Sequence, residues 1–380
     1  MRKRPLAILV LCALILPILC LPIKSAPEAF SVQSLSARAA ILIDADDKTV
    51  LAEKCASERM GEASTTKIMT ALVVAESMPL DKIVAVPREA VGTEGSSVYL
   101  CEGELLTVGD LLYALLLASA NDAATALAIL CAGSIEAFAE KMNRRADSLG
   151  LCNTHFTNPH GLYDEDHYTT AYDLALISAE ALRNESLRTV FATRKATVPL
   201  GVTESNPEGE GKRYLQNHNK MLALYDGAIG VKTGFTKKTG RCLVSAAKRD
   251  GMTLIAVTLD APDDWRDHSA LLDYGFSSYE RATVFDVGQF SYPYSVAGGN
   301  EAQVMAINSL PITLTLPKIR ENADTRVEFP QRFEIAPVCE GDILGELTVS
   351  INGKAACSPL VAAYSVEATT KKKHKFFWQS

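Results

Sequence analysis

The segment that decides the fold runs from Glu62 to Ala75 and reads EASTTKIMTALVVA. It places Ser64 three positions before Lys67, a charged residue within an otherwise apolar run. The apolar spacing predicts a buried helix that begins near Ser64. Because residues three apart share one face of a helix, the hydroxyl and the amine are expected to lie side by side. The pair is either a helix cap followed by a lysine that reaches solvent, or a nucleophile beside its base.

The second interpretation needs an uncharged amine. A serine becomes an effective nucleophile only when a base takes its proton. Burial of Lys67 among Ile68, Met69 and Leu72 would favour the neutral amine. Backbone N–H groups in the first helical turn would stabilise an oxyanion formed there. The Ser-x-x-Lys spacing alone is frequent by chance, so it leaves both interpretations open.

Two further motifs follow along the chain. Residues 119–121 (Ser-Ala-Asn) lie at a break between two apolar helical runs, where a hydroxyl and an amide can point into a cleft. The alternative is an ordinary turn with Asn121 or Asp122 capping the next helix. Residues 232–234 (Lys-Thr-Gly), within GVKTGFT, lie on a predicted strand, although a strand-end turn has the same composition. The three motifs in this order are far more specific than any one of them.

The ordered set resembles the serine D-alanyl-D-alanine carboxypeptidases, the low-molecular-mass penicillin-binding proteins. Segments such as GSSVYLCEGE, FTNPHGL and HYTTAYDLALIS resemble that family too, and the resemblance spans most of residues 30–367. It implies that Ser64 attacks the carbonyl of a terminal D-Ala-D-Ala bond and forms an acyl-enzyme. Lys67 would accept the proton, and Ser119 would relay one to the leaving D-alanine. Water would then release the shortened peptide.

The resemblance also implies a substrate-binding set, namely Asn121, Lys232, Thr233, Gly234 and Phe235. Asn121 would bond the substrate amide or position the base, and Lys232 with Thr233 would bind the terminal carboxylate. The N–H groups of the nucleophile and of Phe235 would form the oxyanion hole. No metal or other cofactor is expected. The implied partners are the peptidoglycan stem peptide as substrate and β-lactam antibiotics as covalent inhibitors.

The order of the predicted elements indicates an α+β fold, with helices packed on an antiparallel sheet as in β-lactamases and penicillin-binding proteins, plus a small C-terminal all-β domain. Residues 40–51 read as a hairpin, as do the runs 241–247 and 252–259 around Asp250-Gly251. Between them the pattern is helical. Asp110 is expected to cap the run 111–118, and Thr170 with Asp173 to form a capping box.

The expected division of the chain is a signal peptide over 1–26, a catalytic serine peptidase domain over 27–278, a β-sandwich over 279–367 and a basic, aromatic tail over 368–380. The first segment has the basic, apolar and small-residue regions of an export signal, with an uncleaved membrane anchor as the alternative. The tail, KKKHKFFW, suggests either a weak peripheral membrane contact or a frayed terminus.

Composition limits the partners and the compartment. The formal charge is −7, and removal of residues 1–26 would also remove four basic residues and make the chain more acidic. Nucleic acid is therefore not an expected partner. An exported, extracytoplasmic location in the cell wall or periplasm is expected, with membrane association left open. Of the 9 cysteines, Cys12 and Cys20 lie in the signal. The odd remainder and the lack of C-x-x-C predict scattered, buried thiols rather than a disulfide framework.

The sequence leaves three alternative functions open. A serine β-lactamase would share the three motifs, but its Glu-x-x-Leu-Asn segment is matched only by EALRN at 180–184, with leucine one position early. A catalytically inactive wall-binding scaffold would keep the fold with a disabled site. A metal enzyme is suggested by the acidic and histidine residues of THFTNPHGLYDEDHYTT, namely His155, His160, Asp164, Asp166 and His167. Their spacing fits no metal signature, and a polar surface loop is the simpler interpretation.

Overall fold

The computed structural model describes residues 30–319 and 323–369. The expected signal peptide and most of the tail lie outside these residues. In the first part of the chain the helices are α1 (Lys67–Ser77), α2 (Val108–Leu117), α3 (Asn121–Ala132), α4 (Ile135–Ser148), α5 (Ala171–Arg183), α6 (Glu185–Ala192), α7 (Met221–Leu224) and α8 (Asp264–Ser278). The strands there are β1 (Ala39–Asp44), β2 (Val50–Lys54), β3 (Ile83–Ala85), β4 (Leu105–Thr107), β5 (Lys195–Pro199), β6 (Lys212–Gln216), β7 (Ala228–Thr236), β8 (Gly240–Arg249) and β9 (Met252–Leu259).

The main sheet of this part is antiparallel and has five strands in the order β2-β1-β9-β8-β7. Both predicted hairpins are present, as the β1–β2 and β8–β9 pairs. The turn between β8 and β9 has φ of 48° at Asp250 and 78° at Gly251. A two-residue hairpin turn of type I′, whose twist matches that of the flanking strands, requires a positive φ at both positions. Strand β7, which carries the Lys-Thr-Gly motif, forms one edge of this sheet. Its outer side is therefore free of a neighbouring strand of the same sheet.

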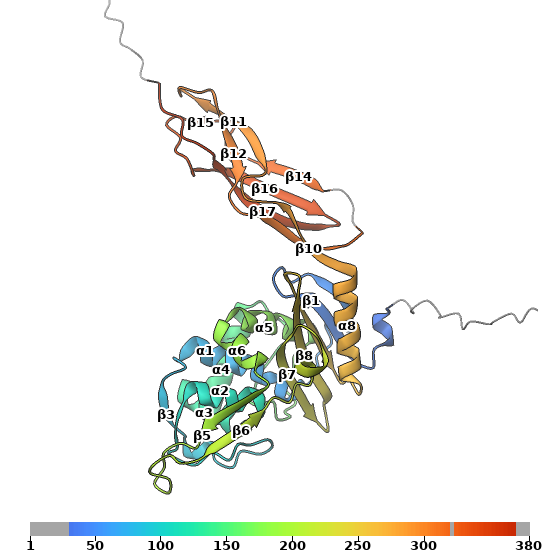
Figure 1. Cartoon of the computed structure of the whole chain (residues 1–380), viewed down its shortest axis with the longest axis vertical. Coiled ribbons are helices and arrows are strands. Elements are labelled where there is room, and N and C mark those ends of the chain that lie inside the picture. The colour runs from blue at the N-terminus through green and yellow to red at the C-terminus, as the bar shows by residue number, and fades with distance from the viewer. Residues whose placement is uncertain (1–29, 320–322, 370–380) are drawn as a thin grey trace, which may run out of the picture. The chain divides into compact units, whose positions relative to one another are not determined.

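Helices cover both faces of the sheet, as Figure 1 shows. Helix α8 packs on β8 and β9 from one side, and α5 packs on β1 and β9 from the other. Helix α1 contacts α2, α3, α4 and α5, so it runs through the middle of the helical layer. Eight of its residues, Lys67–Val74, are buried. Burying a charged lysine without partners costs a large amount of free energy, so the contacts of the Lys67 amine decide how the site works.

Two helix starts differ from the sequence prediction. Ser64 lies in a 3-10 turn, η2 (Ala63–Thr66), and the α-helix begins at Lys67. Asp110 is the third residue of α2 and not its cap, since the Thr107 hydroxyl accepts from the Asp110 N–H and the two form a capping box. The prediction at Asp110 was wrong because threonine three positions earlier satisfies the same free N–H groups. Thr170 caps α5 as predicted, since its hydroxyl accepts from the Asp173 N–H, but the predicted capping box is only half formed, because the Asp173 Oδ2 accepts from the Asn153 N–H and the Thr154 hydroxyl instead.

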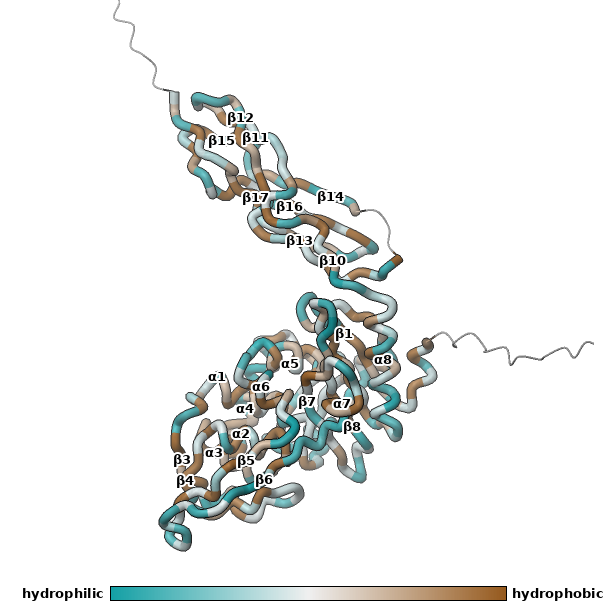
Figure 2. The backbone as a smooth tube through the Cα atoms, in the orientation of Figure 1, coloured by the Kyte–Doolittle hydropathy of each residue, from teal (hydrophilic) through white to brown (hydrophobic). Residues whose placement is uncertain are grey.

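After Ser278 the chain is all-β. Its strands are β10 (Tyr279–Phe285), β11 (Ser291–Ala297), β12 (Gln303–Asn308), β13 (Ile312–Pro317), β14 (Asp324–Glu328), β15 (Glu334–Ile335), β16 (Ile343–Ile351) and β17 (Lys354–Ala362). They form a six-stranded sheet, β14-β16-β17-β12-β11-β15, and the pair β10-β13. Figure 2 shows the alternation of hydrophobic and hydrophilic residues along β16 and β17, as expected of strands with one face on a core. That core is separate from the one beneath the helices.

The cysteine prediction was wrong in one respect. Five thiols of the described residues are exposed, those of Cys55, Cys101, Cys152, Cys339 and Cys357, and only Cys242 is fully buried. All seven described cysteines are free, so no disulfide joins them. Most of them lie in loops or on the open faces of strands, where apolar character does not lead to burial.

Among the described residues, no single helix is long and apolar enough to cross a membrane. The bent pair α3–α4 meets the length and composition required only when its two helices are taken together.

Candidate active site

Ser64 and Lys67 are brought together by the junction of η2 and α1. The Lys67 Nζ lies 2.9 Å from the Ser64 Oγ. It also lies 2.7 Å from the Asn121 Oδ1 and 2.7 Å from the carbonyl oxygen of His160. Lys67 itself has no exposed surface. Three polar atoms therefore surround an amine that water does not reach.

These three contacts suit an uncharged amine. A neutral amine has two N–H groups and one lone pair, and the two carbonyl-type oxygens of Asn121 and His160 can accept only N–H. The lone pair is then left for the Ser64 hydroxyl. Burial, and after it the repulsion of Lys232, holds the pKa of Lys67 well below its ordinary value, against the smaller opposite effect of Asp122. Geometry and electrostatics agree that Lys67 can take the serine proton.

The Ser-Ala-Asn motif lies at the junction of α2 and α3. Ser119 has φ of 59°, a left-handed conformation that turns the chain between the helices, and its side chain is 5% exposed. The Asn121 amide is fixed at both ends, since its Nδ2 donates to the Glu94 carbonyl at 2.6 Å while its oxygen faces the lysine. The buried Asp122 carboxylate accepts from Ser97 and from nearby backbone N–H groups. It thereby holds the 94–100 loop against this break.

The Lys-Thr-Gly motif lies on the edge strand β7, directly against the nucleophile turn. A Cβ added at Gly234 would come within 2.8 Å of the Glu62 carbonyl oxygen and 3.0 Å of the Ser64 nitrogen. Only glycine allows this approach. It brings the backbone of the next residue, Phe235, beside the first turn of η2, as an oxyanion hole made of two N–H groups requires. The Phe235 side chain itself is 64% exposed.

Lys232 lies beneath this strand and not in the open cleft. It is 1% exposed, and its Nζ donates to the Thr233 carbonyl at 2.8 Å. Burial lowers its pKa to about 7. The charge of Lys232 in turn lowers the pKa of Lys67, and the Lys232 amine is partly neutral at physiological pH.

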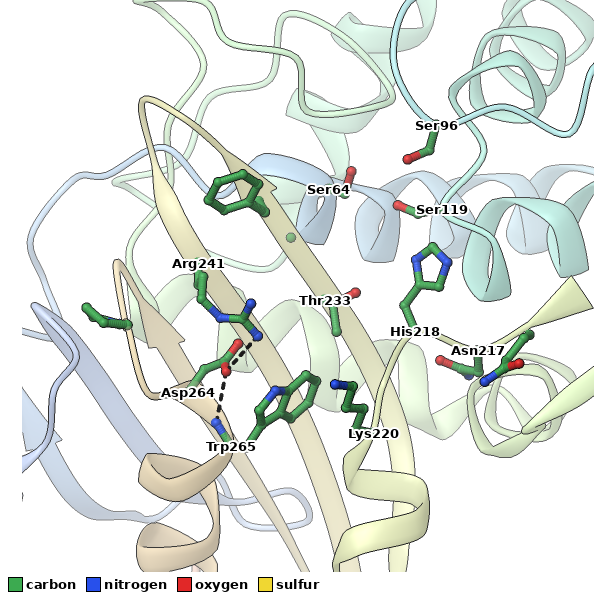
Figure 3. A pocket seen from close by; sticks show the side chains of 14 residues that line it. Ser64, Ser96, Ser119, Asn217, His218, Lys220, Thr233, Arg241, Asp264 and Trp265 are labelled. Carbon is green, nitrogen blue, oxygen red and sulfur yellow. Dashed lines mark hydrogen bonds and ion pairs between the residues drawn. The ribbon is translucent and has the colours of Figure 1, made fainter.

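An open cavity of about 880 Å³ connects these elements. Figure 3 shows Ser64 and Ser119 at its upper end, Thr233 in the middle, and Arg241, Asp264 and Trp265 on the side where α8 begins. His218 and Lys220 line the side formed by the segment between β6 and α7. Of the predicted site residues, Ser64, Ser119, Thr233, Gly234 and Phe235 line the cavity. Lys67, Asn121 and Lys232 are buried directly behind it.

The structure adds partners that the sequence did not reveal. The His160 carbonyl accepts from the base, and a main-chain atom has no sequence signature. Behind the nucleophile turn, the Thr66 hydroxyl lies 2.9 Å from the His167 Nε2, and the same ring nitrogen lies 3.0 Å from the buried Glu62 carboxylate. His167 is 101 residues away from Thr66 along the chain, so only the fold brings them together.

The histidine-rich loop is only in part the surface loop that was expected. Asp164 and Asp166 are exposed, but His160 and His167 are buried against η2 and α1. Burial, and after it the charge of Lys67, lowers the pKa of His160 to about 3, so this ring is neutral. Within residues 30–319 and 323–369 no group of three or more His, Cys, Asp or Glu side chains could hold a metal ion. The loop thus supports the lysine and the turn.

Comparison with known proteins agrees with this geometry. Residues 25–263 match the family described as D-alanyl-D-alanine carboxypeptidase, and residues 279–368 match the C-terminal domain of penicillin-binding protein 5. The chain is 34% identical over 355 residues to the D-alanyl-D-alanine carboxypeptidase DacF of Bacillus subtilis, covering 89% of this chain and 90% of the relative. It is 32% identical over 364 residues to DacC of Escherichia coli, covering 90% and 88%.

Solved structures give the same picture. Penicillin-binding protein 5 of Haemophilus influenzae superposes with a TM-score of 0.72 at 26% identity, covering 88% of this chain and 98% of that one. The DD-transpeptidase of Streptomyces K15 superposes with a TM-score of 0.60 at 35% identity, covering 64% of this chain and 98% of that one. The predicted α+β fold with a C-terminal all-β domain is therefore confirmed.

Proposed function

The chain belongs to the D-alanyl-D-alanine carboxypeptidase family, and from this premise we propose how its residues carry out the reaction. It is a serine-type D-Ala-D-Ala carboxypeptidase of the penicillin-binding class that acts on peptidoglycan peptides of the cell wall. The observation that carries the mechanism is the buried Lys67 amine, with two carbonyl-type oxygens on its N–H groups and the Ser64 hydroxyl as its third neighbour.

In the first half of the reaction, the Ser64 Oγ attacks the carbonyl carbon of the penultimate D-alanine while Lys67 takes its proton. The carbonyl oxygen becomes an oxyanion and receives hydrogen bonds from the N–H groups of Ser64 and Phe235, an arrangement that typically contributes a few kcal/mol. Ser119 relays the proton taken up by Lys67 to the nitrogen of the terminal D-alanine, the C–N bond breaks, D-alanine leaves, and Lys67 is neutral again. The acyl group then remains on Ser64.

In the second half, a water molecule gives a proton to the neutral Lys67 amine and attacks the acyl carbon. The ester bond to Ser64 breaks, Lys67 returns the proton to the Ser64 Oγ, and the shortened peptide leaves. Asn121 holds Lys67 through both halves and presents its amide edge to the substrate. Gly234 lets the peptide backbone lie against β7. β-Lactams acylate Ser64 at the same place and are therefore covalent inhibitors.

We also propose the finer features of location and organisation. Residues 1–26 direct export, residues 27–278 form the catalytic domain and residues 279–367 a β-sandwich domain, a division supported by the end of α8 at Ser278 and the start of β10 at Tyr279. Residues 368–380 make a weak peripheral membrane contact. A fusion of the first 26 residues to a periplasmic reporter tests the export signal.

The direct test is mass spectrometry of a muramyl pentapeptide after incubation with pure protein. We expect the loss of one alanine, about 71 mass units, and a protein adduct when a fluorescent penicillin is added instead. A protein that takes the label but releases penicillin rapidly and leaves the pentapeptide intact would be a β-lactamase. A protein that takes no label and removes no alanine would be an inactive scaffold.

A further inference from the structure

Three polar side chains meet in the interior behind the nucleophile turn. The His167 Nε2 lies 3.0 Å from the Glu62 Oε1, and the Thr66 hydroxyl lies 2.9 Å from the same ring nitrogen. The Glu62 side chain has no exposed surface, and that of His167 is 3% exposed. None of the three is among the described residues that line the cavity, so this cluster can act on the reaction only through the turn itself.

The hydrogen bonds of the His167 ring show where its proton lies. The Thr157 N–H donates to the His167 Nδ1 at 3.1 Å, so this nitrogen is an acceptor. A neutral imidazole has one acceptor and one donor nitrogen, and the proton is therefore on Nε2. The Nε2–H donates to the Glu62 carboxylate and to the Thr66 oxygen. The Thr66 hydroxyl then donates to the Ala63 carbonyl at 2.8 Å, its shortest contact with an acceptor in the turn.

The Glu62 carboxylate lowers the stability of the fold at this position. Its Oε1 has two partners, whereas its Oε2 is buried and has no hydrogen-bond partner among the described residues. Burial disfavours a polar group whose hydrogen bonds are incomplete. An apolar side chain of similar volume would avoid this cost. Stability alone therefore does not account for an acid two positions before the nucleophile.

The backbone between this acid and the nucleophile is strained. Ala63 has φ of 49°, in the left-handed region that residues with a side chain rarely adopt. Such a conformation persists only where the surrounding contacts hold it. The Glu62 carbonyl accepts from the Thr65 N–H at 3.2 Å and from the Thr65 hydroxyl at 2.6 Å, and the Glu62 side chain is held by His167. The residue before Ala63 is thus fixed through both its main chain and its side chain.

The peptide group between Ala63 and Ser64 connects the cluster to the reaction. One end of this group is the Ala63 carbonyl, which accepts from Thr66, and the other end is the Ser64 N–H, a predicted donor of the oxyanion hole. Because a peptide group is planar, holding its carbonyl also fixes the direction of its N–H. A hydrogen bond to the carbonyl oxygen also polarises the group and makes the N–H a better donor. Hydrogen bonds therefore run without a gap from His167 to the oxyanion donor.

We propose that His167 is a positioning residue for the oxyanion hole. Through Glu62 and the Thr66 hydroxyl it holds the strained Ala63–Ser64 peptide group in the direction that aims the Ser64 N–H at the oxyanion. The proposal rests on the proposed carboxypeptidase function and adds the residues that keep its oxyanion hole aligned. Because the ring touches no substrate atom, its loss affects the acylation step and not the affinity for the unreacted substrate.

The test is acylation by benzylpenicillin, with the maximal acylation rate and the dissociation constant of the noncovalent complex measured separately. We expect His167→Phe to lower the maximal rate by roughly 10- to 100-fold, part of the effect of removing one oxyanion donor, and to change the dissociation constant by less than about threefold. His167→Gln, whose amide N–H can replace the Nε2–H, should recover part of the rate. Thr66→Val removes only the hydroxyl and should slow acylation as well.

An infrared spectrum of the penicilloyl enzyme separates positioning from a general structural role. Hydrogen bonds from the oxyanion donors polarise the ester carbonyl and lower its stretching frequency. In His167→Phe and Thr66→Val this band should move to higher frequency than in wild-type protein. His155→Phe is the matched control, because His155 lies in the same loop but bonds the Asp166 carbonyl at 2.6 Å and lies beside the Tyr168 ring. It should change neither the rate nor the band.

A slower rate with an unchanged carbonyl band would overturn the proposal, and so would a loss that appears in the dissociation constant while the maximal rate stays normal. If His167→Phe does not fold, Thr66→Val decides the question, and a normal rate and band in that variant would reject the proposed positioning. Failure of the proposed function looks different, because wild-type protein would then form no acyl-enzyme with penicillin.

Discussion

Replacing the buried Lys232 with methionine should make the protein more stable while it damages the site. Lys232 is 1% exposed, and burial lowers its pKa from 10.5 to about 7. Each unit of pKa difference between folded and unfolded chain corresponds to about 1.4 kcal/mol, so the amine costs the fold roughly 5 kcal/mol at neutral pH and below. Methionine has a similar length and carries no charge.

The net gain is smaller than this cost. The variant loses the hydrogen bond from Nζ to the Thr233 carbonyl, and an unpaired buried carbonyl costs about 1–3 kcal/mol. We therefore expect Lys232→Met to raise the free energy of unfolding by roughly 2–4 kcal/mol at pH 6. For a domain of this size that is roughly 5–15 °C in Tm.

The stability gain of Lys232→Met should also depend on pH. Between pH 7 and 10.5 the unfolded chain holds a proton on Lys232 that the folded chain has lost, so wild-type stability rises with pH across this window. Below pH 7 both states are protonated and the full cost remains. The advantage of Lys232→Met should therefore be greatest below pH 7 and should fade toward pH 10.

The assay is thermal unfolding from pH 6 to 10, followed by the fluorescence of Trp265 in a Trp378→Phe background that leaves no other tryptophan. Lys220→Met is the matched control, because the same substitution at an exposed lysine of the same cleft removes no buried charge. A Lys232→Met protein that is no more stable than wild type at pH 6, or whose advantage does not change with pH, would refute the reasoning.

Further outcomes follow from the site. Ser64→Ala should abolish penicillin labelling and lower peptide hydrolysis by about 10³-fold or more, measured by intact mass and by alanine release. Lys67→Arg should acylate nearly as poorly in the same assays, because a guanidinium cannot act as a base; acylation at a normal rate would reject the assigned roles. Gly234→Ala should lower the acylation rate by roughly 100-fold without loss of fold by circular dichroism, because its Cβ pushes β7 off the nucleophile turn. In a pH profile of kcat/KM, activity should fall as pH drops through the lowered pKa of Lys67, and Lys232→Met should move that limb to higher pH by removing a repelling charge; a limb that stays in place would contradict the coupling.

Much of the framework could be predicted from local pattern. The Asp250-Gly251 pair predicted the β8–β9 hairpin because both residues tolerate positive φ, and that turn is present. The apolar run after Lys67 predicted a buried helix because a helix with apolar residues on most of its surface is stable only inside a core, and residues 67–74 are buried. The family predicted from the three ordered motifs is confirmed by the comparisons. The residue roles in the site stay predictions.

What the pattern missed depends on residues distant in sequence. The helix was expected to start near Ser64, but residues 63–66 form a tighter 3-10 turn. The Thr65 hydroxyl donates to the Glu62 carbonyl, and the Thr66 hydroxyl lies between Glu62 and His167. The contacts with Glu62 are local, but the His167 contact reaches the turn from a loop 101 residues further on. Local spacing contains no information about such a partner, so the position of the helix start could not be derived from it.

The same limit explains why the sequence identified the charged groups but not their balance. Lys67 and Lys232 could both be named from motifs, yet their lowered pKa values arise from burial that only the packed fold creates. Two buried amines in one site lower the stability of the fold. The chain tolerates this cost because the apolar burial in the helical layer and the five-stranded sheet offsets it. If the lysines were selected for stability, their removal would weaken the protein. The stabilisation expected for Lys232→Met therefore separates a site shaped by catalysis from one shaped by packing.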